Sequence, residues 1–114
     1  MFLFLAPSAA PKIDTTTARD AYTIYVSWDQ VTAKDRNGII MGYTVFYRMK
    51  GHPNFQNKTI NDATKLSTEI TGLFPYTEVC VKLAAFTKVG LSKNWDREAC
   101  TNITTLQTGK CDTL

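Results

Sequence analysis

Membrane-spanning, metal-binding and nucleic-acid-binding signals are missing from this sequence. No stretch approaches the roughly 18 apolar residues that a transmembrane helix needs. No two Lys or Arg residues are adjacent, whereas a nucleic-acid or membrane-surface role requires a basic cluster. There is no Cys-x-x-Cys pair and His52 is the only histidine, so a zinc site of the usual Cys/His types cannot be assembled. We therefore expect no metal, no nucleic acid and no insertion of this chain into a membrane.

Catalytic signals are missing as well. His52 sits in a stretch rich in Gly, Pro and Asn and is expected to be an exposed loop residue. A nucleophilic cysteine needs a neighbouring base, and none can be inferred. The acidic residues are spread over different loops, and no phosphate-binding Gly-rich loop is present. We expect no catalytic residues, no cofactor and no enzyme activity.

The composition is that of one folded domain. The 114 residues carry a formal charge of +3, with 44% hydrophobic and 20% charged residues, which is ordinary for a globular domain. Residues 11–108 are assigned to the domain, and residues 109–114 to a tail or linker. Residues 1–10 are assigned to a linker or a chain edge, because the apolar start is short and has no basic leader. A degenerate signal peptide is the alternative.

The domain is predicted to consist of β-strands. Residues 22–28, 43–48 and 79–86 alternate apolar and polar side chains with a period of two, the pattern of a half-buried strand. Weaker strands are predicted at 57–60, 66–71 and 99–106. Turn signals recur about every 8–12 residues and no segment has helical periodicity, so the sequence indicates an all-β sandwich. Trp28 is expected to be the largest side chain of its core.

Several motifs resemble the fibronectin type III family. They are Trp28 at the end of a strand, residues 37–48, residues 71–77, and the loop residues Gly90 and Ser92. The resemblance covers about residues 10–108. It implies a seven-stranded, immunoglobulin-like β-sandwich with strands A, B and E in one sheet and C, C′, F and G in the other. It also implies tandem neighbours in an extracellular receptor or adhesion protein.

One departure from the family pattern concerns the turn before strand F. The family usually has a tyrosine at the position of Val79, and its hydroxyl bonds back to the backbone of that turn. The absence of this tyrosine corner is expected to forfeit about 1 kcal/mol of hydrogen bonding.

The three cysteines, Cys80, Cys100 and Cys111, form at most one internal bridge and leave one thiol. If Cys80 lies on strand F and Cys100 on the neighbouring strand G, a disulfide can form, provided that the Cα atoms are about 4.4–6.8 Å apart. It would close a loop of about 20 residues and contribute about 3 kcal/mol. Two unpaired thiols are the alternative. Cys111 is left for another domain, another chain or no partner.

Two segments match the N-glycosylation pattern: Asn57-Lys58-Thr59 and Asn102-Ile103-Thr104. The composition alone gives roughly one such match by chance, but both asparagines fall on predicted surface positions. Asn57 and Asn102 are therefore candidate glycosylation sites.

Two kinds of contact surface are candidates. Phe46 and Phe86 are predicted to point outward from neighbouring strands, where exposed aromatic residues can mark a contact site. Alternatively, the aliphatic parts of the Arg48 and Lys82 side chains cover these two rings. The loops expected at one end of the fold carry mixed charges: Lys34, Arg36, Lys65, Lys88, Lys93 and Arg97 against Asp29, Asp35, Asp62, Asp96 and Glu98. Binding of a heparan-type glycan is therefore only weakly supported, and there is no Arg-Gly-Asp motif.

The leading hypothesis is a non-catalytic module that mediates protein–protein contact, in cis or in trans, and sets the distance between neighbouring domains. Its expected location is the cell surface or the extracellular space, as part of a larger protein. The alternatives are a cytokine-receptor-type ligand-binding domain, an accessory domain of an extracellular enzyme and an intracellular muscle-type module. The Trp-Ser-x-Trp-Ser box of a cytokine-receptor-type domain is lacking, and residues 91–95 match it only weakly.

Overall fold

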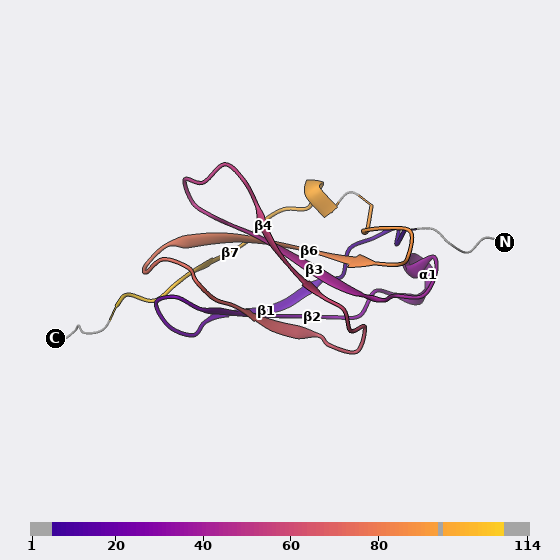
Figure 1. The fold of residues 1–114 in the computed structure, drawn as a ribbon, viewed down its shortest axis with the longest axis horizontal. Coiled ribbons are helices and arrows are strands. Elements are labelled where there is room, and N and C mark those ends of the chain that lie inside the picture. The colour runs from indigo at the N-terminus through magenta and orange to yellow at the C-terminus, as the bar shows by residue number, and fades with distance from the viewer. Residues whose placement is uncertain (1–5, 94, 109–114) are drawn as a thin grey trace.

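A computed structural model describes residues 6–93 and 95–108 (Figure 1). The described residues form two packed antiparallel sheets, which confirms the predicted all-β sandwich. The strands are β1 (Ile13–Ala18), β2 (Ile24–Trp28), β3 (Gly42–Met49), β4 (Gln56–Ile60), β5 (Ser67–Ile70), β6 (Glu78–Phe86) and β7 (Thr101–Thr104). Helix is limited to one α-turn, α1 (Ala33–Arg36), and one 3₁₀ turn, η1 (Trp95–Arg97). In the described part of the chain, no helix has the length and apolar character to cross a membrane.

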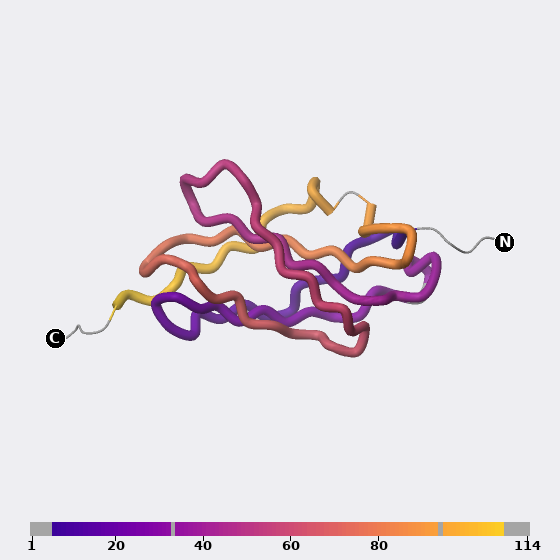
Figure 2. Tube along the Cα trace, viewed as in Figure 1, coloured from indigo at the N-terminus to yellow at the C-terminus, as the bar shows by residue number. Residues whose placement is uncertain are grey.

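The strand order within the sheets matches the order that the resemblance implied. One sheet has the order β1-β2-β5 and the other β4-β3-β6-β7, so they correspond to A-B-E and C′-C-F-G. The described chain begins beside α1 and ends at the opposite end of the sandwich (Figures 1 and 2). The chain therefore runs through the module from one end of its long axis to the other.

The core lies between the two sheets and is built from alternate strand residues. The burial pattern of β2 places Ile24, Val26 and Trp28 inward, and Val45 of β3 is fully buried opposite them. Trp28 is 2% exposed, and its ring centroid lies 5.3 Å from that of Tyr43. Burying each such side chain contributes about 1.5–3 kcal/mol, so this interior is the main stabilising feature.

A threonine replaces the missing tyrosine corner. Val79 is fully buried, and the hydroxyl of Thr105, which is 1% exposed, lies at the turn before β6. Thr105 Oγ1 donates to the backbone oxygen of Phe74 at 2.6 Å and accepts from the Thr77 backbone N–H at 2.9 Å. The expected loss of hydrogen bonding is therefore avoided, because a residue at the end of β7 supplies the hydroxyl from the neighbouring strand.

Substitution of Thr105 by valine tests this assignment. Valine keeps the shape but leaves the partly buried backbone groups of Phe74 and Thr77 without that partner, so we expect a loss of about 1–3 kcal/mol in unfolding free energy. Thr105→Ser, which keeps the hydroxyl, is the matched control. Urea titrations measure both. Equal midpoints for the two variants would contradict the role of the hydroxyl.

Residues 6–8, part of the segment assigned to a linker or chain edge, pack against the domain. Pro7 is fully buried, and its backbone oxygen accepts from the Lys93 N–H at 2.9 Å. The hydroxyls of Thr32 and Ser8 donate to the Asp35 carboxylate at 2.7 and 2.8 Å. These two bonds, that of Thr32 first, hold the pKa of Asp35 below its ordinary value. The start of the described chain is thus tied both to α1 and to the loop after β6.

Candidate contact and modification surface

The outer face of the β4-β3-β6-β7 sheet carries most of the residues that the sequence singled out. Strand alternation turns Phe46 of β3 away from the core, next to Asn57 of β4 and Lys82 of β6, its partners in the strand register. The next row of the same face holds Arg48 of β3 beside Cys80 of β6. This outer face is therefore a mixed aromatic and basic surface.

A tryptophan from outside the sheet covers part of this face. The Trp95 ring of η1 stacks on Phe46 with centroids 3.6 Å apart and planes 8° from parallel. Phe55, just before β4, meets Trp95 edge-on at 6.5 Å. The guanidinium of Arg48 lies 4.7 Å and the ammonium of Lys82 5.5 Å from the Phe55 ring centroid. We call these five residues the outer-face cluster. Cation–π contacts of this kind contribute about 0.5–1 kcal/mol each at exposed sites.

The cations of Arg48 and Lys82, considered as cover for Phe46, instead contact Phe55, and Trp95 contacts Phe46. Trp95 shields one face of the Phe46 ring, a contact that was not predicted from the sequence. Its only signal was a large aromatic residue in an otherwise polar loop.

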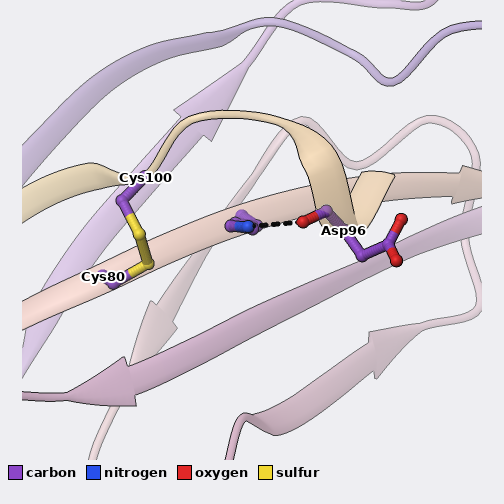
Figure 3. The surroundings of a disulfide bond; sticks show 4 residues. Cys80, Asp96 and Cys100 are labelled. Atoms are coloured by element: carbon purple, nitrogen blue, oxygen red, sulfur yellow. Dashed lines mark hydrogen bonds between the residues drawn. A yellow bond between two sulfur atoms is a disulfide. The ribbon is translucent and has the colours of Figure 1, made fainter. Parts of the chain in front are cut away.

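A disulfide fixes the segment that carries Trp95. The structure joins Cys80 of β6 to Cys100, with Cα atoms 5.1 Å apart, inside the range that a bridge requires. Lys82 Nζ donates to the Asp96 backbone oxygen at 2.7 Å, the dashed line in Figure 3. The bridge and this bond hold residues 95–100 along β6. Cys111 lies outside the described residues.

Phe86 borders a shallow hollow on the same face. The side chain is half-buried and lies over Gly42, where a Cβ atom would collide with the Phe86 ring and the Ile60 carbonyl oxygen. The hollow measures about 450 Å³, and its lining includes Thr44, Phe46, Asn57, Thr59, Phe86 and Leu91. The structure therefore places Phe46 and Phe86, predicted as a contact surface, around one hollow.

The two candidate glycosylation sites lie at opposite edges of this sheet. Asn57 is exposed on β4 and is the register partner of Phe46. Asn102 is exposed on β7 and is the register partner of Cys80. Both are thus accessible on the outer face, but their surroundings differ, because only Asn57 has an aromatic cross-strand neighbour.

The remaining predicted polar residues form no visible reactive site. His52 is exposed in the loop between β3 and β4, with its ring 6.0 Å from that of Phe74. Among residues 6–93 and 95–108, no three His, Cys, Asp or Glu side chains gather as a metal site would require.

Three of the charged residues that we assigned to the loops at one end are placed differently by the structure. Arg36 turns back, and its Nε donates to the Val31 oxygen at 2.9 Å. Asp96 and Arg97 belong to η1, which lies along β6 instead of at the loop tips. Asp96 and Arg97 are therefore not among the charges at the loop tips.

Exposed apolar side chains mark both ends of the sandwich. At the end where the described chain finishes, Tyr22, Phe74, Tyr76 and Leu106 are exposed, Tyr76 by 68%. Backbone hydrogen bonds link their loops: Leu73 N–H donates to the Tyr22 oxygen and Tyr76 N–H to the Leu106 oxygen, both at 3.0 Å. At the α1 end, the exposed apolar residues are Ile39, Met41 and Val89. These end patches were not predicted from the sequence, because each loop contributes only one or two of their members.

Comparison with known proteins relates the chain to one domain family and to two much longer proteins. The family model "Fibronectin type III domain" matches residues 8–100. A sidekick homolog of Caenorhabditis elegans is 34% identical over 89 residues, which cover 75% of this chain and 4% of that protein. Neogenin of Rattus norvegicus is 33% identical over 84 residues, 74% of this chain and 6% of that protein. The chain thus spans a small fraction of the length of these relatives.

A solved structure shows the same fold. The fn3 domain of human contactin 1 superposes with a TM-score of 0.76 at 18% sequence identity, covering 96% of this chain and 87% of that one. From the family model, the relatives and the sheet order together, the chain belongs to the fibronectin type III domain family.

Proposed function

We propose that this domain is a non-catalytic, extracellular protein–protein interaction and spacer module of a cell-surface receptor or adhesion protein. The observation that carries the proposal is the axial layout. The described chain starts at one end of the sandwich and finishes at the other (Figure 2), and both ends expose large apolar side chains. Neighbouring modules that follow along the chain would meet these ends.

Chemical features on the outer face support an extracellular location. The Cys80–Cys100 bridge is of the kind that persists in oxidising compartments and is rare in the cytosol. Asn57 and Asn102 are both exposed within acceptor sequences, as glycosylation requires.

The end patches support contact between modules rather than catalysis. Exposed aromatic residues that gather in one patch commonly mark interaction sites, and Phe74 and Tyr76 do so where the chain leaves the domain. Interfaces between domains of one chain are modest and partly polar, which suits a patch of this composition. The relatives are much longer proteins, of which this chain matches 4% and 6%. This agrees with a module that has neighbours.

Small-angle X-ray scattering of the module with its natural neighbours tests the proposal. Each module should add about 30 Å to the longest dimension, since the nine residues of β6 rise about 3.3 Å each. Phe74→Ser with Tyr76→Ser should leave the fold intact but broaden the distribution of inter-module distances. Lys58→Ser, on an exposed edge strand, is the control. Modules packed side by side, or a double variant identical to the control, would contradict the proposal.

A further inference from the structure

The environment of Asn57 differs from that of an ordinary exposed asparagine. It lies on β4, an edge strand of its sheet, so one side of the strand is open to a modifying enzyme. Residues at i−2 and i+2 share its face because strand side chains alternate, and these are Phe55 and Thr59. Its cross-strand partner is Phe46, with Cβ atoms in such pairs about 4.5–5.5 Å apart. Asn57 is thus bordered by two aromatic rings and a hydroxyl.

The hollow beside Asn57 has the apolar and polar groups that a sugar-binding site needs. Its apolar lining comes from Phe46, Phe86 and Leu91, and its polar lining includes Thr44, Thr59, Thr87 and Lys88. The Oγ1 atoms of Thr44 and Thr59 lie 3.3 Å apart. A pyranose has an apolar C–H face that packs on the negative face of an aromatic ring. Its hydroxyl and acetamido groups can meet the threonines and water at the rim.

We propose that Asn57 carries an N-linked glycan whose first N-acetylglucosamine lies in this hollow against Phe46 and Phe86. This inference rests on the proposed extracellular location, because only the secretory pathway supplies the donor, a polyprenyl-diphosphate-linked oligosaccharide. The Asn57 Nδ2 atom bonds to the anomeric carbon and loses one proton, and the bond from that carbon to the diphosphate oxygen breaks. The sugar, and not a protein partner, then covers the exposed parts of the two phenylalanines.

Asn102 provides an internal comparison. Its cross-strand partner is Cys80, and the hollow beside it is lined by Arg48, Lys50, His52, Glu78 and the disulfide. No Phe, Tyr or Trp ring lines that hollow. A glycan on Asn102 should therefore extend into solvent without adding stability.

The test uses the 114-residue chain secreted behind a heterologous signal from cells that make only high-mannose glycans. Mass spectrometry after glycosidase treatment should show Asn57 occupied. Trimming to a single N-acetylglucosamine should leave the melting temperature unchanged, and removing that last sugar should lower it by about 4–8 °C. With Asn57→Gln, removal of any Asn102 glycan should change nothing. Nuclear Overhauser contacts between the trimmed sugar and the rings of Phe46 and Phe86 need no variant.

The possible results separate the claims. An unmodified Asn57 in secreted protein overturns the modification site. If Asn57 is glycosylated but neither the shift in melting temperature nor the sugar–ring contacts are seen, the proposal that the first sugar lies in the hollow is wrong. Neither result affects the inter-module distances measured by scattering, so failure of this inference and failure of the proposed function are distinguishable.

Discussion

Replacing Trp28 by alanine is expected to lower the free energy of unfolding by about 3–5 kcal/mol. The side chain is 2% exposed at the end of β2 and packs on the ring of Tyr43. Its removal leaves a cavity between the two sheets that the surrounding strands cannot fill. Since a domain of this size is stable by about 5–15 kcal/mol in total, the variant should be close to unfolding.

Urea titration followed by circular dichroism measures this loss without relying on tryptophan fluorescence. Trp95→Ala is the matched control, because Trp95 is half-buried on the outer face and its stack on Phe46 should contribute only about 0.5–1.5 kcal/mol. A Trp28→Ala midpoint equal to that of the unmodified chain would show that the sandwich interior is not where the structure places it.

A second substitution separates the volume of Trp28 from its polar atom. The buried Nε1–H of Trp28 has no hydrogen-bond partner among residues 6–93 and 95–108. An unsatisfied buried donor costs about 1–3 kcal/mol, and Trp28→Phe removes it together with part of the ring. We therefore expect Trp28→Phe to be much milder than Trp28→Ala.

Most of the strands were predictable because they carry their own signal, but β1 (Ile13–Ala18) was not predicted from its residues, since its Asp-Thr-Thr-Thr run has no apolar alternation. Alternation in residues 22–28, 43–48 and 79–86 follows from the geometry of a pleated strand with one dry face, and the structure has β2, β3 and β6 there. Two such faces must cover each other, so the sandwich followed from local pattern alone.

Contacts between distant segments were not predictable in the same way. Val31 lies in a polar stretch, yet it is 3% exposed and joins the core. Thr105 replaces the corner tyrosine from another strand, and Pro7 is buried against the loop after β6. In each case the contacting residues are far away in the sequence, and the flanking residues do not indicate the contact.

The candidate surface was likewise predictable only in part. The alternation of side chains along a strand was enough to predict that Phe46, Asn57 and Asn102 lie on the surface. The stack of Trp95 on Phe46 depends on how the connection from β6 to β7 folds back over the sheet. That path is set by the disulfide and by Lys82, so it required the three-dimensional structure.

Loss of the disulfide is therefore expected to have two separable effects. The Cys80→Ala and Cys100→Ala double variant, made in a Cys111→Ser background to prevent intermolecular pairing, should be less stable by about 3 kcal/mol. This follows because the bridge closes a loop with a sequence separation of 20, and the unfolded chain gains the corresponding freedom. Urea titration against Cys111→Ser alone measures the difference.

The second effect concerns Trp95. Without the bridge, η1 is held on the sheet by the Lys82–Asp96 bond and by the contacts of Trp95 with Phe46 and Phe55, so Trp95 should become more accessible while Trp28 stays buried. Acrylamide quenching of fluorescence under native conditions should therefore increase in the double variant before any unfolding. Unchanged quenching together with a lower midpoint would show that the aromatic contacts and the Lys82–Asp96 bond position the segment without the bridge, and that the bridge acts only on the unfolded chain.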